Sequence, residues 1–239
     1  MDARRASGLT AILLGFLALL GSAVAVPAWA GSLSVMPVRV DVAAGRRFCS
    51  VTLGNDTDRP MTVQVRAFAW TRDENGADIL GPDGGLVVNP SIATIAPGTT
   101  RLVRCSLPAG DPAAQAEQQW RLIVDQLPDP DFSEPGTVQT LLRISLPVFR
   151  AGDKAAPRLS ATVSQGTLRL SNAGTRHVKA LALTLRGVGG DAVTIDRAFY
   201  LLAGGAQNIP IERFPRGGIV SVHVRAEEGE FEAALSPVN

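Results

Sequence analysis

Residues Val138–Phe149 form the sequence VQTLLRISLPVF, and the interpretation of the whole chain depends on this stretch. The odd-numbered residues of this stretch are of mixed polarity and include Gln139, Arg143 and Ser145. The even-numbered residues are nearly all apolar. Successive side chains of a strand point to opposite faces, so the even-numbered row predicts a strand with one apolar face. That face must be covered, either by the core of its own domain or by a partner. The members of the row are Val138, Thr140, Leu142, Ile144, Leu146 and Val148.

The N-terminus has the layout of a secretory signal peptide. Arg4 and Arg5 precede an apolar run from Leu9 to Val26, and Ala28-Trp29-Ala30 supplies the small residues of a cleavage site. A transmembrane anchor is the alternative, and the Gly, Ser and Pro residues that interrupt the run disfavour it. We therefore expect residues 1–30 to be removed, and an exported protein that begins at Gly31 and does not insert into a membrane.

Composition and charge are those of an ordinary globular protein. The 239 residues have a net charge of +1, with 46% hydrophobic and 19% charged residues, which suits one or two domains. Nucleic-acid binding depends on clustered Lys and Arg, so we expect no nucleic-acid partner.

Cys49 and Cys105 are the only cysteines. An even count in an exported chain predicts a disulfide, with two separate buried thiols as the alternative.

From residue 32 onward the sequence predicts β structure only. Short runs rich in Val, Leu and Thr alternate with Gly, Pro, Asn and Asp turns. The breaker-rich segment 151–157 predicts a linker. About seven strands on each side are typical of two immunoglobulin-like β-sandwich domains, at residues 31–150 and 158–239, and a single larger barrel is the alternative. The runs of the first half are Leu33–Val42, Arg47–Gly54, Met61–Thr71, Leu86–Asn89, Ser91–Ile95, Thr100–Leu107, Gln119–Leu127 and Val138–Phe149. Those of the second half are Arg158–Ser164, Thr167–Asn172, Val178–Arg186, Ala192–Ile195, Phe199–Ala203, Ile219–Ala226 and Glu230–Leu235.

No residue pattern indicates catalysis or a metal site. His177 and His223 have no further ligand at a metal-binding spacing, and we expect both at polar surface or edge-strand positions. The carboxylates of Asp125–Asp131 are separated by prolines, which predicts an exposed turn and not an acid/base pair. The acidic run Glu227–Glu232 is expected at a solvated hairpin tip. The sequence therefore predicts neither an enzyme, nor a metal site, nor a cofactor.

Arginines on predicted strands are the more informative polar residues. Arg39 lies within PVRVDV, Arg104 within RLVRCSL, and Arg143 on the mixed face of the opening stretch. A guanidinium that projects from a strand near an interdomain cleft can hold a carboxylate in bidentate geometry. For any single one of these arginines, a solvated surface role is the favoured alternative. Arg39 and Arg143 together, on separate strands, favour an anion-binding role.

Seven motifs occur in order along nearly all of the chain after residue 31. They are PVRVDV, VTLGNDTDRPMTVQVRAFAW, PSIATIAPGTTRLVRCSL, WRLIVDQLP, LLRISLPVF, LRLSNAGTRHVK and FYLLAGGAQNIPI. This ordered set resembles the periplasmic chaperones of pilus assembly, in particular the archaic, spore-coat-U/Csu-like branch of the chaperone-usher pathway. The resemblance implies a non-enzymatic chaperone of two immunoglobulin-like domains in an L-shaped arrangement.

The resemblance also implies how such a chaperone would work. The last strand of its first domain would complete a pilin-type subunit that lacks its own final strand, and the subunit would then pass to an outer-membrane usher. Asp129–Thr137 would be a loop that continues this strand when a subunit is bound. An adhesin or surface-coat protein and an exported glycan-binding or hydrolytic accessory module are the alternatives. The inserted side chains would be Val138, Leu142, Ile144, Leu146 and Val148.

Basic residues in the cleft of this family hold the C-terminal carboxylate of the subunit. Arg39 matches the arginine of the family's first strand. The lysine that the better-known branch carries on its last strand is absent here, because Ser145 and Leu146 occupy its neighbourhood. Arg143 and Arg104 are therefore the further candidates. The resemblance also places Cys49 and Cys105 on adjacent antiparallel strands of one sheet, which is compatible with a disulfide.

Overall fold

The computed structural model describes residues 33–82, 85–109, 116–129, 131, 138–152 and 154–236. The predicted signal peptide and nearly all of the predicted loop Asp129–Thr137 lie outside these ranges. Within them the chain forms strands β1 to β17 and no helix, which confirms the all-β prediction. None of the segments described is a helix that could cross a membrane.

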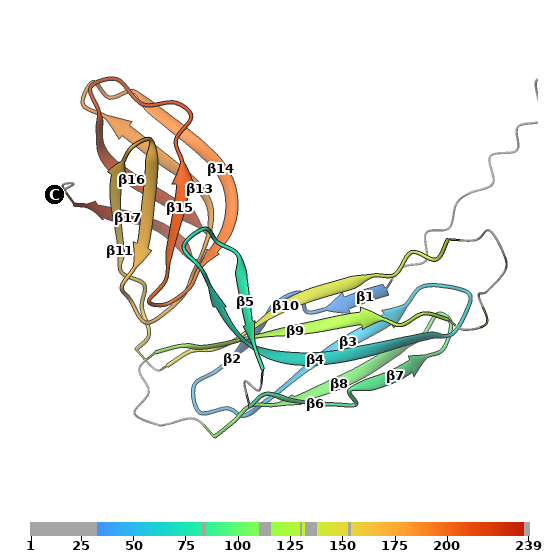
Figure 1. The fold of residues 1–239 in the computed structure, drawn as a ribbon. Coiled ribbons are helices and arrows are strands. Elements are labelled where there is room, and N and C mark those ends of the chain that lie inside the picture. Colours follow the sequence, from blue (N-terminus) through green and yellow to red (C-terminus); the bar gives the residue numbers. More distant parts are fainter. Residues whose placement is uncertain are drawn as a thin grey trace, which may run out of the picture. The chain divides into compact units, whose positions relative to one another are not determined.

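The first sandwich consists of two sheets built from β1 to β10 (Figure 1). All of its strand pairs are antiparallel except β2 with β10, which is parallel. One sheet has the order β1 (Leu33–Met36), β3 (Phe48–Asn55), β8 (Thr100–Ser106) and β6 (Val87–Asn89). The other has the order β2 (Val40–Val42), β10 (Arg143–Arg150), β9 (Gln118–Gln126), β4 (Met61–Arg72) and β5 (Asp78–Gly81), with β7 (Ile92–Ile95) paired to β4.

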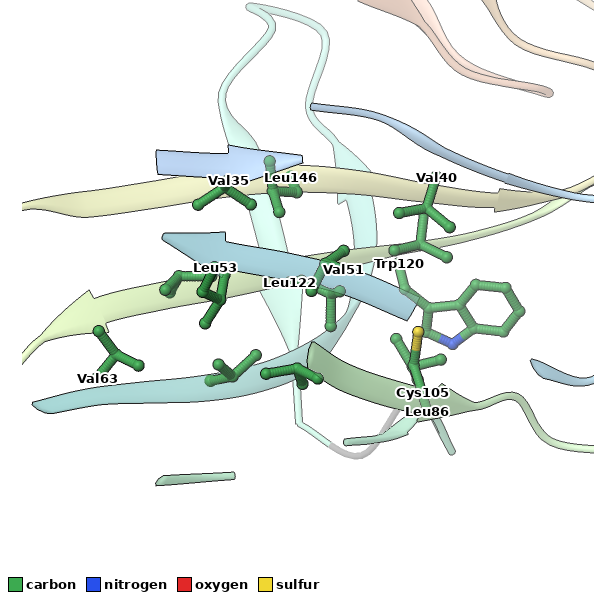
Figure 2. Packing of buried hydrophobic residues seen from close by; sticks show 14 of the residues in the cluster. Val35, Val40, Val51, Leu53, Val63, Leu86, Cys105, Trp120, Leu122 and Leu146 are labelled. Carbon is green, nitrogen blue, oxygen red and sulfur yellow. The ribbon is translucent and has the colours of Figure 1, made fainter. Parts of the chain in front are cut away.

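Alternate residues of the two sheets meet in one apolar core. Leu53 of β3, Val63 of β4 and Leu122 of β9 are completely buried, and Figure 2 shows their side chains between the strands together with Leu146 of β10. This arrangement follows from the two-residue period of strands, which directs one row of each strand inward. Burial of such a side chain contributes about 1.5 to 3 kcal/mol.

The second sandwich contains β11 to β17 and has its own core. Leu168, Leu183, Leu185 and Val222 are fully buried within it. Its presence agrees with two sandwiches and not with one larger barrel. The strand order is β14 (Ala192–Leu201), β13 (Val178–Gly187), β16 (Ile219–Ala226), β17 (Gly229–Leu235), β11 (Leu159–Ser164), β12 (Thr167–Asn172) and β15 (Ala206–Pro210).

Several strand predictions differ from the structure. The run Leu33–Val42 is divided into β1 and β2, which belong to different sheets. Pro37 lies between them, and a proline offers no N–H to a ladder. The predicted strands Ala192–Ile195 and Phe199–Ala203 are joined in the single strand β14, which ends at Leu201. Strands β5 and β15 were not predicted, because neither has a clear apolar alternation.

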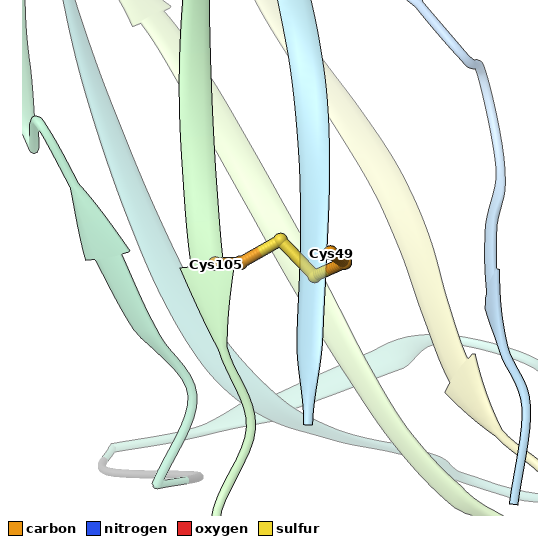
Figure 3. The surroundings of a disulfide bond; sticks show 2 residues. All are labelled: Cys49 and Cys105. Atoms are coloured by element: carbon orange, nitrogen blue, oxygen red, sulfur yellow. A yellow bond between two sulfur atoms is a disulfide. The ribbon is translucent and has the colours of Figure 1, made fainter. Parts of the chain in front are cut away.

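A disulfide joins the two central strands of the first sheet. Cys49 of β3 and Cys105 of β8 are directly opposite each other in the antiparallel register, with Cα atoms 4.9 Å apart (Figure 3). The bond closes a loop of 56 residues. Loop-closure entropy of that size corresponds to about 4 kcal/mol in the chain-entropy model.

Residues 32–239 form one compact unit, and an aromatic cluster joins the two sandwiches within it. Trp70 of β4 and Phe149 of β10 are each 1% exposed and pack with Leu202 and Tyr200 of the second sandwich. The Trp70 ring meets the Tyr200 ring edge-on, with ring centroids 5.6 Å apart. Strand β10 therefore has one inward row in the first core, while Phe149 packs toward the second sandwich.

Candidate functional site: the open edge of strand β10

Strand β10 has a partner strand along its whole length on one side only. Strand β9 pairs with all of Arg143–Arg150, whereas β2 pairs only with Val148–Arg150. Among the described residues, 143–147 therefore form an open edge on the side away from β9. Unpaired backbone groups of an edge strand can accept a further strand.

The apolar row of this stretch runs from solvent into the core. Val138 is 90% exposed and Leu142 is 36% exposed, whereas Ile144 is partly buried against the first core. Leu146 and Val148 are 2% and 0% exposed and belong to that core. The strand itself begins at Arg143, five residues later than predicted. The carbonyl of Leu142 still accepts a hydrogen bond of 2.9 Å from the Gln126 N–H.

This burial divides the predicted insertion row into accessible and buried residues. Leu146 and Val148 are already covered by residues of their own sandwich, so their insertion into a partner would require the sandwich to open. Leu146 and Val148 hold the C-terminal part of β10 in the first core. We call these two residues the fixed base of the strand. The residues of the row that a partner can reach are Val138, Leu142 and, in part, Ile144.

Arg143 pairs with a carboxylate of its own sheet. Its Nε lies 2.5 Å from Asp125 Oδ1, and Arg66 Nη2 lies 2.7 Å from Asp125 Oδ2. Burial acts to raise the pKa of Asp125, but the hydrogen bonds and charges of Arg143 and Arg66 outweigh it and lower that pKa. Asp125 lies within β9 and is 8% exposed. The prediction of an exposed turn is therefore wrong for Asp125, because this carboxylate is covered by the two arginine side chains.

Arg39 also binds carboxylates of its own chain, and most of them come from the second sandwich. Its Nε lies 2.8 Å from Asp41 Oδ2, and its Nη1 lies 2.7 Å from Glu227 Oε2 and 3.6 Å from Glu228 Oε1. The hydrogen bond from Lys179 lowers the pKa of Glu227, and the charge of Arg39 acts in the same direction. The acidic run Glu227–Glu232, predicted to be a solvated hairpin tip, is therefore exposed at its start, and its first two residues form ion pairs.

The three candidate anchor arginines do not converge. In the parallel pairing Val148 lies opposite Val40, so Arg39 lies next to Pro147, four residues along β10 from Arg143. That separation corresponds to about 13 Å along a strand. Arg104 is exposed on β8, in the other sheet. In the structure Arg39 pairs with Asp41, Glu227 and Glu228, whereas Arg143 pairs with Asp125, so these two arginines bind different carboxylates.

The structure reveals a buried histidine that the sequence did not indicate. His177 is 2% exposed, and its Nδ1 lies 2.6 Å from Oε1 of the buried Glu117. Its ring stacks on Phe149 of β10, with centroids 3.6 Å apart and an interplanar angle of 12°. The prediction of a polar surface position is therefore wrong for His177. Glu117 precedes it by 60 residues, and no local pattern connects two residues so far apart.

Arg121 is a buried guanidinium beside the aromatic cluster. Arg121 of β9 stacks over the Trp70 ring at 3.7 Å and pairs with Asp78 at 3.1 Å. Burial lowers the pKa of Arg121, and the charge of Asp78 opposes this effect. Within the ranges described, no group of three His, Cys, Asp or Glu side chains is placed to hold a metal ion.

Comparison with known families identifies the class of this protein. The model of the family described as pili and flagellar-assembly chaperone, PapD N-terminal domain, matches residues 32–154. This match covers more than half of the chain, and the chain belongs to this family. The family resemblance seen in the sequence is confirmed, and the family is one of chaperones and not of enzymes. A search of curated proteins finds no match to the chain.

Solved structures of pilus chaperones share the fold. A chain of the CsuC–CsuE chaperone–tip adhesion subunit complex, from the archaic chaperone-usher Csu pili of Acinetobacter baumannii, has 20% identity and a TM-score of 0.66, with 87% of this chain and 100% of that chain covered. The complex of Salmonella enterica SafA pilin with the SafB chaperone has 16% identity, a TM-score of 0.61 and coverage of 85% and 96%. The E. coli chaperone DraB has 20% identity, a TM-score of 0.60 and coverage of 86% and 97%. At these identities the shared property is the fold, that of two immunoglobulin-like β sandwiches.

Proposed function

We propose that this protein is a periplasmic chaperone that completes pilin-type subunits with strand β10 and delivers them to an outer-membrane usher. The observation that carries the proposal is the open edge at residues 143–147 with an accessible apolar row beside it. Two of the structures with this fold are complexes of a chaperone with a tip adhesion subunit and with a pilin. Membership of the family of assembly chaperones supports the same function.

The inserted residues that we propose are Val138, Leu142 and Ile144. Complete burial of three such side chains contributes about 4 to 9 kcal/mol before the cost of ordering the segment is subtracted. Backbone pairing along residues 143–147 would fix the register of the added strand. Leu146 and Val148 keep the base of the strand in the first core, so the subunit would bind to a strand held at one end. Release would follow replacement of β10 by a better-fitting strand, with no nucleotide and no other cofactor.

Export to the periplasm is supported by the sequence of residues 1–30 and by the disulfide. Structural disulfides persist in oxidising compartments, and the chain forms one between Cys49 and Cys105. The usher is the partner that the family implies for the delivery step. We expect no nucleic-acid partner, in line with the net charge of +1.

Arg39 is the residue that we propose for contact with the subunit's C-terminal carboxylate. It is placed beside the base of β10, and it already binds three carboxylates in a geometry that a fourth could share or replace. Arg143 is held by Asp125 on the face away from the core. Arg104 lies in the other sheet, and both are therefore weaker candidates.

A pair of matched variants tests the proposed insertion row. Leu142→Asp places a charge on the row, and Leu141→Asp places the same charge on the opposite row at a similar exposure, 36% against 40%. Each variant is coexpressed in the periplasm with a pilin-type subunit encoded beside the chaperone gene, and the copurified subunit is measured. We expect a loss of at least tenfold for Leu142→Asp and near-normal recovery for Leu141→Asp. Equal recovery with both variants would overturn the assignment of the row.

A further inference from the structure

The sheet of β1, β3, β8 and β6 carries large apolar side chains on the face that points away from the first core. Alternate residues of its strands belong to that core, so the residues between them point outward. We call this side of the sheet the outer face. The exposed fractions of its large apolar residues are 72% for Met36, 78% for Phe48, 64% for Val87 and 46% for Leu102.

The strand register gathers these four side chains into two rows across the sheet. Residues that are directly opposite each other on neighbouring strands share a face. The two rows are four residues apart along β3, which corresponds to about 13 Å. Each row has an apolar residue at both of its ends and a small polar residue in the middle. The first row is Met36, Thr52 and Leu102, and the second is Phe48, Ser106 and Val87.

The outer face is also basic. Arg104 is exposed and lies opposite Ser50, between the two apolar rows. Arg46 and Arg47 are exposed directly before Phe48. The four strands of the sheet contain neither Asp nor Glu. None of the three arginines forms an ion pair with a carboxylate in the part of the chain that the structure describes. A guanidinium keeps its charge in proteins, so the outer face has positive charge that its own strands do not balance.

This combination of groups indicates the chemistry of a partner. Two copies of the outer face would bring like charges together with no carboxylate between them, which disfavours a dimer through this face. Arg104 separates the two apolar rows, so the rows form no continuous apolar strip for a peptide segment. The surface of an anionic bilayer offers both kinds of contact over a wide area, because its phosphates bind guanidinium groups and its upper acyl segments accept apolar side chains.

We propose that the outer face binds the surface of a bilayer that contains anionic phospholipids, with its arginines among the headgroup phosphates and Phe48 among the upper acyl segments. The chain lies on this surface and does not cross it. Binding is reversible, because only a few apolar side chains and a few charges contribute. The open edge at residues 143–147 belongs to the other sheet, so the inference does not depend on what β10 binds.

Vesicle sedimentation tests the proposal with the chain that begins at Gly31, which lacks the apolar run of residues 9–26. One set of vesicles contains phosphatidylethanolamine and phosphatidylglycerol, and the other contains phosphatidylcholine alone. We expect binding to the anionic vesicles at about 0.01 M salt and its loss at about 1 M salt, because the Debye length falls from about 30 Å to about 3 Å. Equal binding to both kinds of vesicle, or binding to polyglutamate but to neither, would overturn the proposal, and the latter would assign the face to an acidic protein partner.

Matched variants test whether the outer face is the part that binds. Arg104→Glu should lower the vesicle partition coefficient by at least tenfold, and Phe48→Ser should lower it by about fivefold or more. Arg186→Glu and Phe214→Ser change exposed residues of the second sandwich in the same way, and both should leave the coefficient unchanged. Equal losses in the two sets of variants would contradict the assignment. Phe48→Ser should also keep normal capture of a pilin-type subunit, which separates this test from that of the proposed function.

A fluorescent residue reports the orientation of the bound chain directly. Trp70 and Trp120 are 1% and 3% exposed, so a tryptophan introduced on the surface can be distinguished from them. Phe48→Trp keeps an aromatic side chain on the outer face, and Phe214→Trp is its control on the second sandwich. With vesicles of brominated anionic phospholipids, the emission of Phe48→Trp should shift to shorter wavelength and be quenched, whereas that of Phe214→Trp should not change. Quenching of Phe214→Trp alone would show that another face binds and would overturn the proposal.

Discussion

Asp125 shows how strongly a single residue can depart from its sequence neighbourhood. It precedes two prolines and two further aspartates, yet it lies in β9 and receives Arg66 and Arg143 from the strands on either side. Sequence periodicity predicts which strand carries a residue, but it does not predict which long side chains will fold over it. The same limit applies to His177, whose partner Glu117 comes from the other sandwich.

We predict that Asp125→Asn destabilises the protein by about 1 to 2 kcal/mol at pH 7, because the charge-assisted hydrogen bonds from Arg66 and Arg143 are weakened and both arginines are partly exposed. The arginines lower the pKa of Asp125, although burial opposes them. A carboxyl with a lowered pKa in the folded state stabilises above its unfolded pKa of about 3.9, and this contribution disappears as pH falls further. Urea unfolding at pH 7, 5 and 3 should show the gap to wild type closing only at acid pH. Asp131→Asn, at an exposed position, is the control and should show no gap at any of these pH values.

Strands β3 and β8 show what sequence can establish for elements. Both were predicted within one or two residues, because each has strong alternation between clear turn signals. With only two cysteines in a chain predicted to be exported, the pairing was also predictable. We predict that Cys49→Ala with Cys105→Ala lowers the free energy of unfolding by up to about 4 kcal/mol. Denaturant titration of the double variant, compared with reduced wild type, measures the effect. An unchanged midpoint in both samples would show that the strands do not depend on the bond.

The hairpin between β4 and β5 was not predictable, because its contacts lie on the second sandwich. The Asn208 N–H donates to Glu74 O at 2.7 Å, and Arg169 pairs with Glu74 at 2.7 Å. Gly76, at φ +83°, approaches Gln207 so closely that a Cβ atom would lie 2.1 Å from its Oε1. Sequence patterns describe how a strand meets its own sheet. They carry no information about a hairpin that extends beyond its own sheet to another sandwich.

We predict that Gly76→Ala destabilises the protein more than Gly45→Ala does. Both glycines have positive φ, +83° and +72°, but a Cβ atom at Gly45 would have nothing within 4 Å. Gly45→Ala therefore measures the backbone strain alone, about 1 to 2 kcal/mol. Gly76→Ala adds displacement of the buried Gln207 side chain and the loss of its hydrogen bond to Asn208 O, about 1 kcal/mol more. Equal unfolding free energies for the two variants would mean that the close approach of Gly76 to Gln207 does not contribute to stability.

At the scale of the whole molecule, Arg39 is a residue whose effect on the stability of the protein and whose effect on subunit binding can be measured separately. Arg39 immediately precedes β2, its guanidinium binds Glu227 of the second sandwich, and it lies beside the fixed base of β10. The family resemblance singled out Arg39, but the predicted strand Leu33–Val42 is interrupted there, and Arg39 lies between β1 and β2. The occupation of the guanidinium by the chain's own carboxylates was not predictable, because Glu227 is 188 residues away.

We predict that Arg39→Ala reduces capture of a pilin-type subunit by at least tenfold, since a charge-assisted contact with a carboxylate is lost. The unfolding free energy should change by only about 1 kcal/mol or less, because the ion pairs of Arg39 are partly exposed. Glu227→Gln is the matched control, because it weakens the same contact between the sandwiches but keeps the arginine and removes one of the three carboxylates that it binds. If Arg39 is the carboxylate anchor, Glu227→Gln keeps or increases capture, since an internal competitor is gone. If both variants lose capture equally, Arg39 acts only by joining the sandwiches, and copurification yields measured beside urea unfolding curves distinguish the two cases.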